Sequence, residues 1–193
     1  MKIIGGKFKN RNFYMPEEVR PTQNVVRKAV FDILGQDFEG KEVLDLFAGS
    51  GAMGLEALSR GAKKVVLVEK DPQCIDVLEQ NMRLFDVPHG TRDRGGYELL
   101  NLDSFAAIKL LHSQSQKFDF IYIDPPYRRD LGKKALKRLE AYDILHPNCV
   151  VVIEHHSKDF LPQDSDFLSL FKQRTYGTTR VSFYKKAGVP ESD

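Results

Sequence analysis

The sequence has few of the residues that form disulfide bonds or bind structural metals. It contains two cysteines, Cys74 and Cys149, which lie far apart in segments predicted to be buried, so we expect reduced thiols. Neither the cysteines nor the five histidines show the paired spacing of a zinc site. We therefore expect no structural metal.

Long apolar runs and targeting patterns are also absent. No stretch is long enough to span a bilayer, and no signal-peptide pattern is present. We therefore expect a cytoplasmic protein without a membrane partner, and we take a monomer as its working state. The length of 193 residues suits one domain with a small appendage.

Strand-like and helix-like segments alternate from Lys41 onward. The predicted strands are residues 43–47, 65–69, 97–102, 118–123 and 150–153, and the segments between them carry apolar residues at helical spacing. Residues 167–176 and 179–184 are typical of a closing antiparallel hairpin. The pattern predicts an α/β fold with a mostly parallel, doubly wound, seven-stranded sheet that has an antiparallel pair at one edge.

The ends of the chain differ from this regular part. Residues 1–20 are predicted to form a basic β appendage, a short hairpin with a flexible point at Gly5 and Gly6. Residues 21–186 form the main domain, whose first helix has Thr22 as its N-cap, and residues 187–193 are expected to fray. Arg20 and Arg27, near the start of that helix, are either substrate contacts or surface charges.

A glycine-rich turn follows the first predicted strand. Residues 49–54, with the sequence G-S-G-A-M-G, open a helix, which is the context of a nucleotide-binding loop. Glu69 ends the next strand, where a carboxylate accepts hydrogen bonds from ribose hydroxyls. Dinucleotide and S-adenosylmethionine sites share both features. Asp45, just before the turn, favours S-adenosylmethionine, whose cationic methionine end suits a nearby carboxylate better than a pyrophosphate does.

The buried strand at residues 118–123 ends abruptly at Asp124, Pro125, Pro126 and Tyr127. Asp124 and the carbonyl group of Pro125 suit the two N–H bonds of an exocyclic amine on a planar base. The prolines fix the turn, and Tyr127 offers a stacking surface. Taken alone, this segment is equally consistent with a simple strand-terminating turn.

Four carboxylates lie within or at the ends of successive predicted strands: Asp45, Glu69, Asp103 and Asp124. Because the carboxyl ends of parallel strands meet at one edge of a sheet, these side chains are expected to converge on one crevice. Asp103 would suit the amine of adenine. Each acid alone could be a helix cap or a solvated residue, but the set of four favours a common site.

Together these motifs resemble class I amino-methyltransferases, which have a Rossmann-like fold. Residues 45–51, Glu69, Asp103 and the turn at 124–127 carry that resemblance. Residues 3–6 (I-I-G-G), 20–22 (R-P-T) and 47–60 are similar to the RsmD type, and the likeness extends to about Tyr184. The RsmD type transfers a methyl group from S-adenosylmethionine to the N2 amine of guanine 966 in bacterial 16S ribosomal RNA.

The resemblance implies two groups of site residues and no metal. The catalytic group consists of Asp124, Pro125, Pro126 and Tyr127. The cofactor-binding group consists of Asp45, Phe47, Gly49, Ser50, Gly51, Glu69, Asp103 and Ser104.

Basic residues are concentrated in two segments although the net charge is only +2. Residues 1–28 contain seven basic and two acidic residues, and residues 128–138 contain six basic residues and one acidic residue. Such runs are usually solvated faces, but the second directly follows the amine-binding turn, which favours contact with a phosphate backbone. The candidate RNA-binding residues are Lys7, Arg11, Arg20, Arg128 and Arg129. The expected partner is 16S ribosomal RNA within a partly assembled small ribosomal subunit.

Other functions stay open on the sequence alone. DNA adenine and protein glutamine methyltransferases use the same turn, although this chain has no spare length for a separate target-recognition domain. A nicotinamide-dependent oxidoreductase fits the glycine turn but leaves the Asp124 turn unexplained. A non-catalytic RNA-binding module would not need the cofactor-binding acids.

Overall fold

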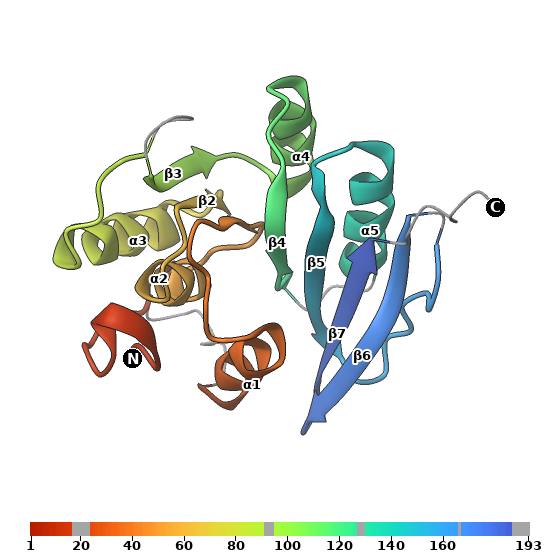
Figure 1. Cartoon of the computed structure of the whole chain (residues 1–193), viewed down its shortest axis with the longest axis horizontal. Helices are drawn as coiled ribbons and strands as arrows, with labels where there is room; N and C mark the ends of the chain where they lie inside the picture. Colours follow the sequence, from red (N-terminus) through yellow and green to blue (C-terminus); the bar gives the residue numbers. More distant parts are fainter. Residues whose placement is uncertain (17–23, 91–94, 127–129, 166, 187–193) are drawn as a thin grey trace.

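The computed structural model describes residues 1–16, 24–90, 95–126, 130–165 and 167–186. All seven described strands form one sheet in the order β3-β2-β1-β4-β5-β7-β6 (Figure 1). They are β1 (Glu42–Asp45), β2 (Lys64–Glu69), β3 (Gly96–Asn101), β4 (Phe118–Ile123), β5 (Leu145–His156), β6 (Leu168–Tyr176) and β7 (Thr179–Lys186). β1 to β5 run parallel, and β7 is antiparallel to both β5 and β6. The predicted doubly wound sheet with an antiparallel edge pair is confirmed.

Helices cover both faces of the sheet (Figure 1). They are α1 (Asn24–Leu34), α2 (Ala52–Ser59), α3 (Pro72–Leu84), α4 (Ser104–Ser113) and α5 (Leu131–Ala141). α1, α2 and α3 share one apolar core with Val43 and Val65, whereas α4 and α5 share the other with Leu44 and Val66. Consecutive strand residues thus point into opposite cores, as expected for strands buried on both faces. No helix in the described ranges is long and apolar enough to cross a membrane.

Both cysteines are buried and free, which confirms the prediction for them. Cys74 lies on α3, and Cys149 lies on β5 in the core shared with α4 and α5. Burial raises the pKa of Cys74 to about 11 and also raises the pKa of Cys149. Both side chains are therefore neutral thiols at physiological pH.

β5 is longer than the predicted strand at residues 150–153. Its first residue, Leu145, pairs with Phe118, and the register shifts before Val150 pairs with Phe120. Pro147, which is typical of turns, lies between these two pairings. The long-range pairing with β4 therefore overrides the local sequence signal.

In the N-terminal segment (residues 1–16), residues 1–3 and 10–13 run antiparallel and are joined by backbone hydrogen bonds, which confirms the predicted short hairpin. A single antiparallel bridge joins Lys2 to Asn12, and a short 3₁₀ helix, η1 (Gly6–Phe8), lies between them. Besides this pairing, the segment is held by the main domain through hydrogen bonds to Glu56 and Ser59 of α2. Its N–H groups and those of the main domain meet at one buried carboxylate.

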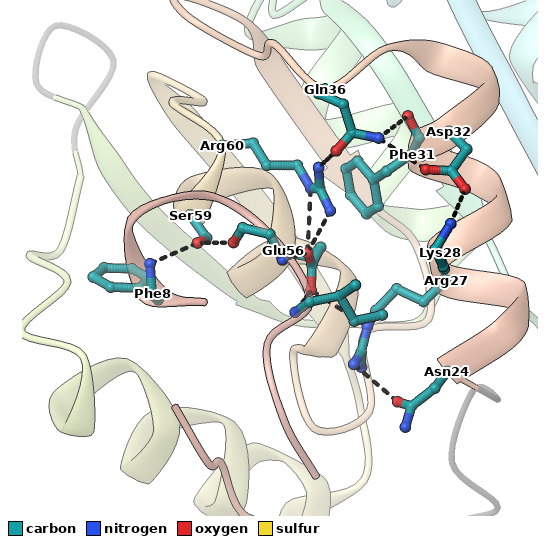
Figure 2. Close-up of polar contacts among 12 residues, drawn as sticks. Phe8, Asn24, Arg27, Lys28, Phe31, Asp32, Gln36, Glu56, Ser59 and Arg60 are labelled. Carbon is teal, nitrogen blue, oxygen red and sulfur yellow. Dashed lines mark hydrogen bonds and ion pairs between the residues drawn. The ribbon is translucent and has the colours of Figure 1, made fainter. Parts of the chain in front are cut away.

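That carboxylate is Glu56 of α2, which joins three parts of the chain (Figure 2). It accepts hydrogen bonds from the backbone N–H groups of Ile4 and Gly5, at 3.0 and 2.7 Å. It also forms ion pairs with Arg27 of α1 at 3.4 Å and with Arg60 at 2.8 Å. Arg27 is fully buried (0% exposed), so both sequence interpretations of it, substrate contact and surface charge, are wrong. The flexible point expected at Gly5 is wrong as well, because Glu56 holds its backbone.

Gly6 and Gly40 form a matched pair for testing how the N-terminal segment is attached. Both have a left-handed φ, +71° and +72°, but only at Gly6 would an added β-carbon collide with a neighbour, the carbonyl oxygen of Ser59. Gly40→Ala should lower the free energy of unfolding by about 1–2 kcal/mol, the cost of the left-handed backbone. Gly6→Ala should lower it by about 2 kcal/mol more, because the segment is pushed away from α2. Urea unfolding measures both losses, and equal losses would contradict the attachment.

Candidate active site

The candidate site lies where the order of the strands reverses. β1 and β4 are neighbours in the sheet, and the chain leaves them toward opposite faces, through α2 and α5. In open parallel sheets, ligands bind beyond the carboxyl ends of the strands at such a point. Here a cavity of about 900 Å³ occupies that position, and we call it the main cavity.

Most of the predicted site residues line the main cavity. They are Asp45, Phe47, Gly49, Ser50, Glu69, Asp103, Ser104, Asp124, Pro125 and Pro126. Gly51 is not one of its lining residues, because it lies one step back as the N-cap of α2. Tyr127 lies outside the described residues. The structure thus brings the four acids of successive strands to one cavity.

The glycine turn is fixed by its contacts with β2. Gly49 has a φ of 52°, and its N–H donates to the Glu69 carboxylate at 2.8 Å. Gly51 has a φ of 77°, which favours glycine at the start of α2. A β-carbon at Gly54 would lie 2.6 Å from Leu67, so the third glycine allows α2 to pack closely on β2.

Glu69 is held by backbone donors at the end of β2. Besides the N–H of Gly49, its carboxylate accepts the N–H groups of Lys70 and Asp71, at 2.8 and 3.0 Å. An ionised carboxylate has about four lone-pair positions. The three backbone hydrogen bonds therefore orient Glu69 and leave acceptor capacity toward the cavity.

Asp103 and Ser104 lie where β3 leads into α4. The Asp103 carboxylate caps α4 by accepting the N–H of Phe105 at 3.0 Å, and it pairs with Lys70 at 3.5 Å. The hydroxyl group of Ser104 donates to the carbonyl group of Leu46 at 2.6 Å, which ties the start of α4 to the end of β1. Both residues therefore have a structural task in addition to lining the cavity.

Asp45 is the most deeply buried of the four acids, with 2% of its surface exposed. Burial raises the pKa of Asp45 to about 7, and the charge of Glu69 also raises it, against the lowering effect of a hydrogen bond from the N–H of Phe47. That hydrogen bond is long, at 3.4 Å. Near neutral pH the carboxyl group is therefore divided between its neutral and charged forms, and a bound cation would favour the charged form.

The sequence prediction missed a second group of polar residues on the β4–β5 side of the cavity. The hydroxyl group of Tyr122 donates to the Glu154 carboxylate at 2.9 Å, and both residues are buried. Burial raises the pKa of Tyr122, and the charges of Asp124, Glu154 and Asp45 raise it as well. Glu154 follows an apolar run at the end of a predicted strand, so the rule that identified Asp124 would have identified it too.

Asn81 of α3 was also missed, although it supports the glycine turn. Its side chain is fully buried and donates to the carbonyl groups of Ser50, at 2.9 Å, and Tyr14, at 3.0 Å. It accepts the N–H of Tyr14 at 2.8 Å. A lone amide between the core residues Leu78 and Met82 was the available signal. Through Asn81 the N-terminal segment reaches the main cavity, which Met15 helps to line.

The predicted RNA-binding residues are placed away from the main cavity where they are described. Arg11 donates to the carbonyl group of Leu84 at 2.7 Å, and its guanidinium group lies over the ring of Phe85, 4.4 Å from the centroid. Lys7 lies over the ring of Phe8, at 4.8 Å. Neither lines the main cavity. Arg20, Arg128 and Arg129 lie outside the described residues.

Comparisons with known proteins agree with this architecture. A family model described as "Conserved hypothetical protein 95" matches residues 1–185. "Putative rRNA methyltransferase YlbH" of Bacillus subtilis (strain 168) is 31% identical over 190 residues, which cover 97% of this chain and 100% of that protein. "Ribosomal RNA small subunit methyltransferase D" (RsmD) of Escherichia coli (strain K12) is 30% identical over 195 residues, covering 100% of this chain and 93% of that protein.

A solved structure is similar along its whole length. It is described as "Putative methyltransferase yhhF from Escherichia coli", and it matches with a TM-score of 0.81 and 28% identity, covering 96% of this chain and 97% of that one. The sheet order and the flanking helices are those of the class I methyltransferase fold. The chain therefore belongs to the Conserved hypothetical protein 95 family, that of the RsmD and YlbH methyltransferases.

Proposed function

We propose that this protein methylates the N2 amine of a guanine in small-subunit ribosomal RNA, at the position equivalent to guanine 966 of 16S RNA. The observation that carries the proposal is a single cavity with two chemically different ends. Asp45, Glu69 and Asp103 lie at the carboxyl ends of β1, β2 and β3, and the turn of Asp124 and Pro125 follows β4 on the other side of β1, so in the strand order they line opposite parts of the cavity. The first end suits a methyl donor with a cationic centre, and the second suits an amine.

The methyl donor is S-adenosylmethionine, as in methyltransferases of this fold. The residues present fit it, because the half-ionised Asp45 carboxyl group gains a favourable partner in a cationic methionine end. In this proposal Glu69 accepts from the ribose hydroxyls and Asp103 accepts from the adenine amine. When bound, S-adenosylmethionine supplies an electrophilic methyl group on its sulfonium.

Asp124 and the carbonyl group of Pro125 are assigned to the amine of the target base. The nitrogen lone pair of guanine N2 is delocalised into the ring, so the amine is a poor nucleophile. Accepting both of its N–H bonds would favour a pyramidal nitrogen with its lone pair toward the methyl donor. The hydrogen bond to the Asp124 carboxylate contributes roughly 1.5–3 kcal/mol, and the one to the neutral carbonyl group of Pro125 roughly 0.5–1.5 kcal/mol. Holding the reactants in line contributes about 7–11 kcal/mol, so positioning is the larger effect.

The proton on the newly methylated nitrogen requires no strong base. A methylated aryl ammonium is acidic, so Asp124 or water can accept its proton. Tyr127, which lies outside the described residues, is proposed to stack on the base, an interaction of about 1–3 kcal/mol that would offset the few kcal/mol of unstacking a guanine. The prolines keep N–H donors away from this turn.

Ribosomal RNA is preferred to the other amine substrates because the relatives that match along nearly the whole chain are named as ribosomal RNA methyltransferases. Adenine in DNA and glutamine in proteins share the turn chemistry but have no such support here. The proposed partner is a partly assembled small ribosomal subunit, with Lys7, Arg11, Arg20, Arg128 and Arg129 as candidate contacts to the RNA backbone.

Mass mapping of small-subunit RNA tests the proposed substrate directly. In cells that lack this protein, the guanine equivalent to position 966 should lose one methyl group, and a plasmid-borne copy of the gene should restore it. An unchanged methylation map in the deletion strain would contradict the proposal. Restoration by the Asp124→Ala variant would contradict the assigned role of that residue.

Asp124→Ala and Asp103→Ala separate the two ends of the main cavity. Asp124→Ala should reduce methyl transfer at least about 100-fold, because the amine loses its charged acceptor, while the Kd for S-adenosylmethionine stays unchanged. Asp103→Ala should instead raise that Kd by roughly 10-fold, the effect of one charged hydrogen bond. Calorimetry measures the Kd, and transfer of a labelled methyl group measures activity. Weaker cofactor binding in Asp124→Ala would place that residue at the wrong end.

The raised pKa of Asp45 predicts that a rise in pH lowers the stability of the protein and raises its affinity for the cofactor. Because its pKa in the folded protein, about 7, exceeds the ordinary value of 3.8, the stability contributed by the protonated form is complete below about pH 4 and lost as the pH rises to about 7. Asp45→Asn should therefore be more stable than the wild type at pH 8, by roughly 1–4 kcal/mol. Denaturant unfolding at pH 4 and pH 8 measures this difference.

Cofactor binding should show the opposite preference. Affinity of the wild type for S-adenosylmethionine should rise between pH 5.5 and pH 7.5 as Asp45 ionises, and Asp45→Asn should bind more weakly with a flatter profile. Calorimetry at matched ionic strength gives both curves. A variant with the pH profile of the wild type would exclude Asp45 as the titrating group.

A further inference from the structure

A second cavity, of about 550 Å³, adjoins the main cavity, and we call it the side cavity. The two share Pro125, Pro126 and Glu154 as lining residues. The remainder of the side cavity is lined from residues 155–161 and from the start of α5, with the exposed ring of Phe160 among them. A base that presents its amine to the Asp124 turn would therefore lie in the main cavity, beside residues that also line the side cavity.

Glu154 is one of the residues that line both cavities. β5 pairs with β4 in a parallel register that matches Ile153 to Ile123, so Glu154, within β5, follows beside Asp124, the residue after β4. Glu154 is 5% exposed, and its carboxylate accepts the Tyr122 hydroxyl at 2.9 Å. Burying a carboxylate costs several kcal/mol. The methyl-transfer steps assigned to Asp124 and Pro125 give this second carboxylate no task.

The Watson–Crick edge of guanine offers a hydrogen-bond donor that Glu154 could accept. Its N1–H lies beside the N2 amine, so guanine presents one further N–H bond next to the two of the amine. Asp124 and the carbonyl group of Pro125 take the two N–H bonds of the amine, and a further acceptor is needed next to them for N1–H. We propose that Glu154 accepts the N1–H of the target guanine and so selects guanine over purines whose N1 carries no hydrogen. This inference rests on the proposed function.

The surroundings of Glu154 suit a selective acceptor. An ionised carboxylate has about four lone-pair positions, so it can accept from more than one donor at a time, and the Tyr122 hydroxyl is one of the donors to Glu154. The hydrogen bond from the hydroxyl also fixes the direction of the carboxylate, so the side chain does not need to be ordered by the base. A purine with a bare N1 would place its own lone pair against a buried carboxylate, which is a repulsive contact. Guanine is therefore favoured twice: its N1–H forms a hydrogen bond with Glu154, and a purine without that hydrogen is repelled by the carboxylate.

The test compares guanine with 2-aminopurine at the target position of the RNA. 2-Aminopurine keeps the amine that accepts the methyl group but has no hydrogen on N1. The wild type should prefer guanine by roughly 10- to 100-fold in kcat/KM, the range for one charged hydrogen bond. In Glu154→Gln the ratio should fall to about 1 or below, because the amide nitrogen can donate to a bare N1 while its oxygen still accepts from Tyr122.

Asp159→Asn is the matched control. It makes the same carboxylate-to-amide change at a residue that lines the side cavity but not the main cavity, and should keep the guanine preference of the wild type. A general loss of structure in Glu154→Gln would lower activity on both bases together and leave their ratio unchanged. The ratio therefore reports recognition of N1 and not stability.

The outcomes distinguish an error in the role of Glu154 from an error in the proposed function. If the wild type methylates guanine and Glu154→Gln retains the full preference over 2-aminopurine, Glu154 does not read N1, and the proposed function still stands. If the wild type methylates neither base in a small-subunit particle, although calorimetry shows S-adenosylmethionine binding, the proposed substrate is wrong. Equal rates of the wild type on both bases would also overturn the role of Glu154.

Discussion

The cost of burying a carboxylate is the constraint on which this structure depends. A charged group removed from water loses several kcal/mol unless cations or N–H donors replace its hydration. Glu56 is fully buried, and two arginines and two backbone N–H groups surround it. That group therefore acts as a structural centre, which holds the N-terminal segment, α1 and α2 together.

Asp45 is nearly as buried but lacks such compensation. Within the described residues it accepts a long hydrogen bond from one backbone N–H, at 3.4 Å, and burial, together with the charge of Glu69, raises its pKa to about 7. The two buried carboxylates, Glu56 and Asp45, thus differ in the number of donors and cations that replace their hydration. A carboxylate with its partners in place stabilises the fold, whereas one without them stores free energy that a cationic ligand can release.

The sequence predicts those parts of the structure that local patterns determine. Each of these patterns depends on a short segment: the alternation of strands and helices, the glycine turn, and the acids at strand ends. The glycine turn and the acids were correctly expected at the carboxyl ends of the strands. The predictions failed where a distant partner decides the outcome. β5 extends through Pro147 because β4 pairs with it, Arg27 is buried because Glu56 faces it, and Asn81 gains its role from Ser50. No window of neighbouring residues contains those partners.

The alkylation rates of the two buried thiols report how often the protein opens around each of them. Cys74 lies on α3 on one side of the sheet, and Cys149 lies in the core on the other side. Because alkylating reagents react with the exposed thiolate and both groups are buried and protonated, labelling proceeds from conformations that expose each thiol, for Cys74 beside the main cavity and for Cys149 within the opposite core. Two reaction rates on one chain thus distinguish local loosening beside the main cavity from separation of the opposite layer.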